Sequence, residues 1–245
     1  MMKVLQISEY SHFIKNAREL PFGRVYPLSV AEGFQSGMIY SSANCVLFRH
    51  KYNYSYIWGT PGETQLRSIY ELIINSGMKL MFADAHICSL FSEWGGVTLI
   101  PRNNYSYPHD SAPKFVLPEG FSVKDIDNGL FDRLKGRVTP SLFWDDPEQF
   151  RKYGKGICIM HGDEPASWAF TAGVSSEECD IGIETAEPFR HRRLAYAAAS
   201  ALISEILPKK RPLWSCQQSN RGSACIAEKL GFVKTYEYIM IRKAD

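Results

Sequence analysis

The stretch IGIETAEPFRHRRLAYAAASALI, residues 181–203, has the pattern of a strand end, a short loop and an alanine-rich helix. Four consecutive basic residues, Arg190 to Arg193, stand where the helix is expected to begin. A helix start already exposes unpaired backbone N–H groups and carries a partial positive charge, so cations there are unfavourable unless an anion binds. The pattern predicts a phosphate or pyrophosphate site at this turn, and it is equally consistent with a solvated basic turn.

We expect the helix to run from Arg190 to about Leu207, because Pro208 cannot continue it. Its apolar stripe is formed by Leu194, Ala198, Leu202 and Ile206. Alanines flank this stripe and let the helix lie close to a sheet. The strand end, the loop and the helix start would then point their free N–H groups toward one place.

The composition is that of an ordinary globular protein. The length of 245 residues allows one large domain or two small ones. Hydrophobic residues make up 45% and charged residues 22%, both usual values. The formal net charge of +2 does not support nucleic-acid binding through bulk charge, so any anion site must be local.

The cysteines and the absence of long apolar stretches bear on location. Six cysteines are scattered without a C-x-x-C pair, and Cys158 stands in the apolar run GICIM. Such usage indicates small buried side chains in a reducing compartment. The N-terminus has no apolar signal core, and no stretch approaches about 20 uninterrupted apolar residues. We therefore expect a cytoplasmic protein with no membrane partner.

A proline-rich segment, residues 101–120, looks like a connection between two parts of the chain. We expect an N-terminal α/β domain over residues 1–112 and a second domain over residues 113–245. The first domain has no recognisable motif, and no internal repeat is visible. The second predicts the order β, α, β, β, β, α, β, α, β.

Two motifs in that order resemble the GCN5-related N-acetyltransferases (GNAT family), and the resemblance covers about residues 119–245. The R-x-x-G-x-A turn of that family corresponds to Arg190, His191, Arg192, Arg193, Leu194 and Ala195. The family's N-x-x-(A/S)…L-G-F element corresponds to Asn220 through Phe232. The set Trp214, Cys216, Asn220 and Ser223 also resembles a bacterial subgroup like the zwittermicin-resistance acetyltransferase.

The resemblance implies an α/β (α+β) fold of the acyl-CoA N-acyltransferase type, with a mixed, splayed sheet flanked by helices. The N-terminal α/β domain would be an addition to it or a degenerate copy of the same fold. Acetyl-CoA, the co-substrate, would lie between the strand CDIGIET and the strand LWSCQQ, and no metal is implied. The implied cofactor-binding residues are Ile181, Ile183, Thr185, Arg190, His191, Arg192, Arg193, Leu194, Ala195, Asn220 and Ser223.

The implied reaction is the transfer of an acetyl group to an amine, with a small molecule as the expected acceptor rather than a protein. Amino acids, polyamines, aminoglycoside-like antibiotics and protein N-termini all stay open as acceptors. Nucleic acid is not expected as a partner, because the helix LAYAAASALI is too apolar to read a groove. A homodimer is left open.

Two departures from the family pattern bear on activity. Arg193 replaces the glycine of the turn, although a helical arginine can still offer its backbone N–H. Ala227 replaces a tyrosine that, in many members, protonates the leaving thiolate. Ser223, Cys225, Tyr236, Tyr238 or water can replace it, or no acid is needed. A non-catalytic CoA-binding module or sensor is therefore the alternative function.

The catalytic candidates are Glu184 as general base and Ser223 as general acid. Glu184 ends the strand where the thioester should lie, and a carboxylate can take a proton from an ammonium. It can equally be a solvated charge at a strand end. Asn220 has two open roles, as the N-cap of the following helix and as a contact of the pantetheine arm.

Overall fold

The computed structural model describes residues 2–245, and the backbone divides into two compact units. Unit 1 comprises the chain up to Asn104, together with Gln217–Ser219 and Tyr236–Asp245. Unit 2 comprises Tyr105–Cys216 and Asn220–Thr235. The division is therefore not a single cut, because the end of the chain returns to unit 1. Within residues 2–245, every helix is too short or too polar to cross a membrane.

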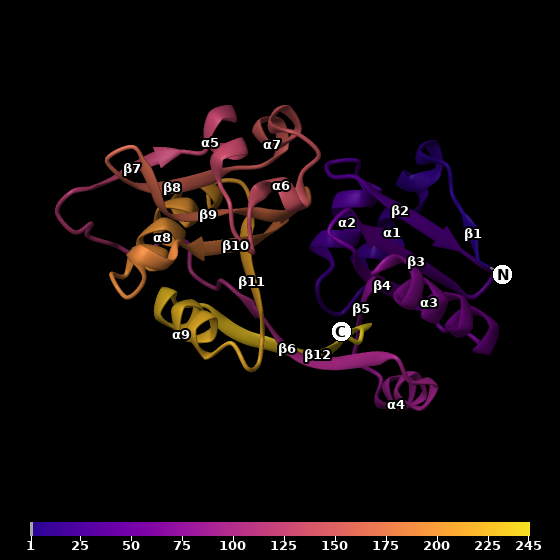
Figure 1. Ribbon diagram of the computed structural model, residues 1–245. Helices are drawn as coiled ribbons and strands as arrows, with labels where there is room; N and C mark the ends of the chain where they lie inside the picture. Colours follow the sequence, from indigo (N-terminus) through magenta and orange to yellow (C-terminus); the bar gives the residue numbers. More distant parts are fainter. Residues whose placement is uncertain (1) are drawn as a thin grey trace. The chain divides into compact units, whose positions relative to one another are not determined.

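Unit 1 is built on a mixed sheet in the order β1-β2-β3-β4-β5-β12-β6 (Figure 1). Its strands are β1 Lys3–Val4, β2 Gly37–Ser41, β3 Cys45–His50, β4 Tyr54–Gly59, β5 Lys79–Phe82, most of β6 Val97–Ser106 and the end of β12 Val233–Lys243. Its helices are α1 Ile14–Arg18, α2 Val25–Ala31, α3 Glu63–Ser76 and α4 Ala85–Trp94, with a 3₁₀ helix over Ile7–Phe13. Neighbouring strands from β1 to β4 are antiparallel, β4 and β5 are parallel, and β12 runs antiparallel to β5.

The core of unit 1 follows from the periodicity of α3. Leu66, Ile69 and Ile73 recur at helical spacing and are buried in one apolar cluster. Strand residues such as Leu47 and Leu80 complete that cluster. Gly77, in the left-handed conformation, ends α3. A residue without a Cβ adopts that conformation without a steric cost.

Unit 2 contains the sheet β11-β10-β9-β8-β7. Its strands are β7 Phe121–Asp125, β8 Gly156–His161, β9 Glu164–Val174, β10 Glu178–Thr185 and β11 Arg211–Gln217. Its helices are α5 Asn128–Arg133, α6 Pro140–Phe143, α7 Pro147–Tyr153, α8 Leu194–Ile206 and α9 Arg221–Leu230, with a 3₁₀ helix over Glu187–Phe189. The mixed sheet with flanking helices confirms the predicted fold.

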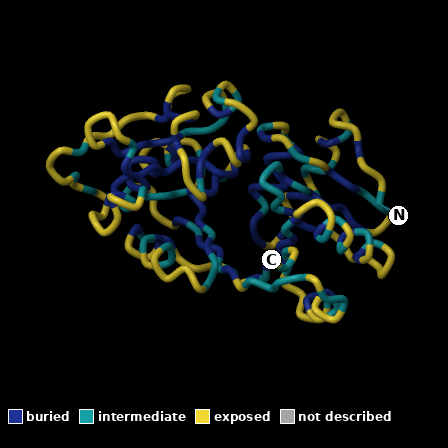
Figure 2. Tube along the Cα trace, viewed as in Figure 1, coloured by how far each residue is buried: buried dark blue, intermediate teal, exposed yellow. Residues whose placement is uncertain are grey.

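Helix α8 packs on β8, β9 and β10, and four of its five alanines are buried (Figure 2). Its predicted start at Arg190 is wrong. His191 and Arg193 have φ values of 65° and 62°, a left-handed conformation that no residue inside an α-helix adopts. The helix therefore begins at Leu194, with Arg193 as its N-cap.

Strands β10 and β11 separate soon after they meet. They pair in parallel through three residues of β10, Glu178 to Asp180. The pairing of β10 with β9 then shifts register between Asp180 and Ile181. Strand β10 continues to Thr185 along β9, so its other edge is left without β11 from Ile181 onward.

The cysteines are all free, and five of the six are buried, as their apolar surroundings indicated. Burial raises the pKa of the Cys158 thiol to about 12 and raises that of Cys179 still further. Thiols with such pKa values stay protonated near neutral pH and are poor nucleophiles.

Candidate active site

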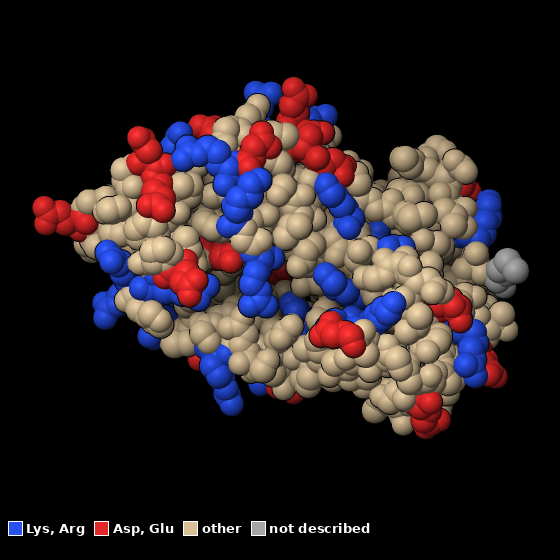
Figure 3. All heavy atoms as spheres, in the orientation of Figure 1, with Lys and Arg blue, Asp and Glu red and all other residues tan. Residues whose placement is uncertain are grey.

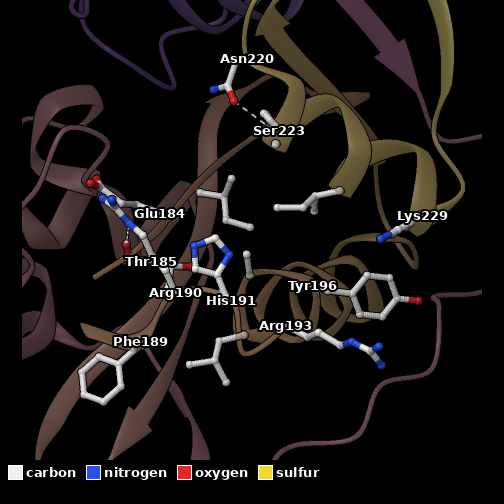
Figure 4. A pocket seen from close by; sticks show the side chains of 15 residues that line it. Glu184, Thr185, Phe189, Arg190, His191, Arg193, Tyr196, Asn220, Ser223 and Lys229 are labelled. Atoms are coloured by element: carbon white, nitrogen blue, oxygen red, sulfur yellow. Dashed lines mark hydrogen bonds between the residues drawn. The ribbon is translucent and has the colours of Figure 1, made fainter. Parts of the chain in front are cut away.

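A pocket of about 1060 Å³ opens in unit 2 beside the end of β10 (Figure 4). Its walls come from the end of β10, the turn before α8, the first turn of α8 and one side of α9. The pocket thus brings together the two sequence motifs, which are separated in the chain by α8 and β11.

The β10 wall consists of Ile183, Glu184 and Thr185. Glu184 is half-buried, and its Oε2 accepts a hydrogen bond from the backbone N–H of Val138 at 2.6 Å. The Thr185 hydroxyl lies 2.8 Å from that of Ser167. The carboxylate is therefore held by the protein at one oxygen while the residue faces the pocket.

The turn before α8 supplies Arg190, His191 and Arg193 to the lining. No side chain caps the N-terminus of α8, so the first-turn N–H groups of Leu194 and Ala195 are not satisfied by a capping residue. Both of these residues line the pocket. Backbone donors and the positive end of a helix thus face the same space.

The charge of the pocket wall is mostly positive. Arg190, Arg193 and Lys229 line it together with His191, and within residues 2–245 none of the three cations is ion-paired with a carboxylate. Arg190 donates a long hydrogen bond of 3.5 Å from Nε to the carbonyl of Thr185. On the face seen in Figure 3, Lys and Arg side chains gather over α8 and α9. The wall can accommodate an anion, because a phosphate would find charges that no protein group neutralises.

The α9 wall begins with two hydrogen bonds at Ser223, one to its backbone and one to its hydroxyl. Asn220 caps α9 by accepting a hydrogen bond from the backbone N–H of Ser223 at 3.1 Å. The indole N–H of Trp214 donates to the Ser223 hydroxyl oxygen at 3.0 Å. Because that oxygen accepts, the hydroxyl proton of Ser223 is still available to a group in the pocket.

The structure brings most, but not all, of the sequence-predicted site residues to the pocket. Ile181 is buried beside the bulge and Arg192 is exposed, and neither lines the pocket. Ala227 is fully buried in the core side of α9. Tyr236 and Tyr238 belong to unit 1, where both rings stack on Phe22, and Cys225 is exposed away from the lining. Ser223 is the one proposed proton donor that lines the pocket.

Sequence reasoning missed five residues of the lining, which are Phe189, Tyr196, Gly222, Ile226 and Lys229. A signal for one of them was present. Ile226 follows Ser223 by three residues, so the two lie on the same face of α9.

The pocket fits a long anionic nucleotide thioester. Its volume is in the upper range of ligand sites, and its walls combine an open strand edge with free helix N–H groups and cations. Within residues 2–245 there is no cluster of three or more metal-binding side chains.

Comparison with known proteins points to one family for the second part of the chain. Residues 102–241 match the model of the GNAT acetyltransferase family. An "Uncharacterized N-acetyltransferase YdfB" of Bacillus subtilis is 28% identical over 141 residues, which is 56% of this chain and 54% of that protein. The match thus spans about half the length of this curated relative.

Two solved structures resemble nearly the whole chain. A GCN5-related N-acetyltransferase-like protein from Streptococcus suis has a TM-score of 0.78 at 23% identity, covering 98% of this chain and all of that one. A Drosophila protein has a TM-score of 0.64 at 16% identity, covering 99% and 98%. These likenesses show the fold. Because the family model spans more than half of the sequence and the pocket lies within that span, the chain belongs to the GNAT acetyltransferase family, whose members use acyl-CoA to acetylate amines.

Proposed function

We propose that unit 2 transfers an acetyl group from acetyl-CoA directly to the amine of a small molecule. The observation that carries this proposal is the uncapped, left-handed start of α8 beside the open edge of β10. Free N–H groups at a helix start bind phosphate, and an open strand edge can pair with the amide groups of an extended ligand.

Each wall of the pocket has a role in holding the donor. The first-turn N–H groups of α8 would bind the pyrophosphate, with Arg190 and Arg193 adding charge-assisted hydrogen bonds. The edge of β10 from Ile181 to Thr185 would pair with the pantetheine arm, which places the thioester near Glu184. Asn220 would then contact the arm while it caps α9.

The chemistry needs a base and a group that accepts the departing sulfur. Glu184 takes a proton from the ammonium, directly or through a water, and the freed amine attacks the thioester carbonyl. The new C–N bond forms as the C–S bond breaks, and the electron pair leaves with the sulfur. Ser223 donates its hydroxyl proton to the thiolate, and the second proton of the attacking nitrogen passes through water to restore the Ser223 hydroxyl as the neutral amide forms.

The acceptor is proposed to be a small molecule. The resemblance of Trp214, Cys216, Asn220 and Ser223 to the zwittermicin-resistance subgroup supports this choice. A second candidate function, a CoA-binding sensor without turnover, is favoured by one observation, the buried Ala227 in place of the family's tyrosine.

Unit 1 is proposed to be a degenerate copy of the same fold, in keeping with a division of the chain near residue 112. The order β2-β3-β4-α3-β5-α4-β6 repeats as β8-β9-β10-α8-β11-α9-β12, with a parallel pair at β4–β5 and again at β10–β11. The start of α3 differs from that of α8, because the backbone N–H of Gly62 donates to the Gln65 side chain at 3.1 Å and Glu63 adds a negative charge. The acidic start of α3 is therefore less suited to a phosphate than the start of α8, where Arg193 is the N-cap.

The test is binding, followed by turnover. At a hundredfold excess over its dissociation constant, CoA should stabilise the protein by about 2.7 kcal/mol in a melting assay. The Arg190→Ala variant should bind CoA about 10- to 150-fold more weakly, the value of a charge-assisted hydrogen bond of roughly 1.5–3 kcal/mol. Arg192→Ala is the matched control, because this neighbouring arginine lies outside the lining.

Two outcomes would contradict the proposal. If millimolar CoA leaves the melting temperature unchanged, the donor site is wrong. If CoA binds but a panel of amines, polyamines and aminoglycosides gives no CoA release from acetyl-CoA, the sensor function replaces transfer.

A further inference from the structure

The loop between α5 and α6, residues 134–139, passes directly over the carboxylate of Glu184. The backbone N–H of Val138 donates to Oε2 at 2.6 Å, which is short for a bond of this kind. Within residues 2–245, no hydrogen bond of the protein reaches the other oxygen, Oε1. One carboxylate oxygen is therefore fixed by a hydrogen bond, and the other has no hydrogen-bond partner among the described residues.

Gly136 lets the loop approach so closely. A Cβ at this position would lie 2.5 Å from Oε2 of Glu184, 2.7 Å from its Cδ and 2.9 Å from its Oε1, distances that real Cβ atoms essentially never show. The φ of Gly136 lies outside the left-handed region, so its backbone does not require glycine. The glycine is thus needed for space at the carboxylate.

Trp168 holds the loop from the strand next to β10. It lies directly across from Glu184 in the β9–β10 register and is only 2% exposed. Its indole N–H donates to the carbonyl of Val138 at 2.8 Å. Val138 is therefore held at its N–H by Glu184 and at its C=O by the cross-strand neighbour of Glu184, which closes a ring of contacts.

We propose that residues 134–139 are a positioning clamp for the general base, with Gly136, Val138 and Trp168 as its positioning residues. The clamp fixes Oε2, so that Oε1 is the oxygen that receives the proton of the acceptor amine. This inference rests on the proposed role of Glu184. Its physical basis is that a base held in one orientation transfers protons faster, since a displacement of about 1 Å can cost a factor of roughly 100.

The first experiment displaces the carboxylate without removing it. Gly136→Ala should lower kcat about 10- to 100-fold, with acetyl-CoA as donor and glycinamide as acceptor, while the affinity for CoA stays within twofold. Gly129→Ala in α5 is the matched control, because its Cβ would meet Asp127 at an ordinary 3.5 Å. Wild-type kcat in a folded Gly136→Ala protein would overturn the clamp.

A double-mutant cycle separates positioning from mere strain. In Glu184→Gln the glutamine side chain has nearly the shape of glutamate but cannot act as a base. The methyl group that Gly136→Ala introduces would therefore crowd it in the same way. Gly136→Ala should then lower kcat in the wild type but have no further effect in the Glu184→Gln background. Additive losses in the two backgrounds would mean that Gly136 acts through packing, and the inference would fall.

Two further measurements guard against a variant that does not fold. Trp168→Phe keeps the ring packing but removes the indole N–H, and it should lower kcat in the same way as Gly136→Ala, to a smaller extent. Hydrogen exchange of the Val138 amide needs no turnover, and Glu184→Ala should accelerate it at least tenfold relative to wild type.

The failure of the clamp can be told from the failure of the proposed function. If the wild type turns over neither glycinamide nor any amine of the panel, the proposed transfer fails. The clamp is then decided by exchange alone, and unchanged protection of Val138 in Glu184→Ala overturns it.

Discussion

Arg193 holds a backbone conformation that favours glycine, with φ at 62°. A residue with a side chain pays roughly 1–2 kcal/mol of strain in this region. Glycine removes that strain from the folded state, but it also gives the unfolded chain more entropy, so only part of the strain appears as added stability. We predict that Arg193→Gly raises the free energy of unfolding by about 0.5–1 kcal/mol in the absence of ligand.

Urea denaturation of the apo protein measures this effect. Arg193→Ala serves as the control, because alanine loses the same charge but keeps a Cβ. A glycine variant that is less stable than the alanine variant would show that the conformation at this position is not strained.

Lys229 lies across the pocket from Arg190 (Figure 4), so the two side chains would meet different phosphates of CoA. We predict that Lys229→Met lowers the affinity for CoA about 5- to 10-fold, which corresponds to roughly the 1 kcal/mol of a partly exposed charge pair. The affinity for dephospho-CoA should stay nearly the same. Calorimetric titration of both ligands tests this, with the exposed Lys209→Met as control. An equal loss for both ligands would place Lys229 away from the 3′-phosphate.

The predictability of single residues depended on their sequence context. Arg190, Asn220 and Ser223 belong to spaced motifs, so their positions could be inferred. Lys229 could not, since a single lysine on an exposed helix face has the same appearance as a solvated charge. The left-handed Arg193 was also out of reach, because its residue type argues against that conformation.

At the scale of elements, local patterns predicted the strands of unit 2 and the helices α5, α8 and α9, but not the short helices α6 and α7. Alternation and a helical stripe are visible within ten residues or so, as in β9 and α8. Helices α6 and α7 are one or two turns long and are fixed by buried aromatics such as Phe143 and Phe150. Helices of that length depend on tertiary contacts, which a local pattern does not contain.

Helix α9 offers a way to separate the two roles of its N-cap. Asn220→Ala should cost about 1 kcal/mol of stability, because the N–H of Ser223 loses its partner. Asn220→Asp should keep that stability, since a carboxylate caps equally well and favours the helix dipole.

The same aspartate should lower the affinity for CoA, because it places a negative charge in the pocket near the ligand's phosphates. Thermal unfolding and CoA titration of the two variants give both quantities. Equal CoA affinity in wild type and Asn220→Asp would limit Asn220 to its capping role.

For the whole molecule, the repeated order of elements was invisible in the sequence, because it is a repeat of topology without shared motifs. The acidic start of α3, with Glu63 in its first turn, predicts that only one of the two copies binds a nucleotide. Calorimetric titration should therefore give one CoA per chain. A stoichiometry of two would show that unit 1 also binds CoA.

The pairing of β12 with β5 affects how the chain folds during synthesis. Ile239, near the C-terminus, lies opposite Phe82 in unit 1, and Ile241 belongs to the same buried cluster as α3. When the first hundred residues of unit 1 have been synthesised, the strand that covers the edge of β5 has therefore not yet been made. That edge stays open until β12 has been translated, and until then chaperones or the strands of another chain compete for it.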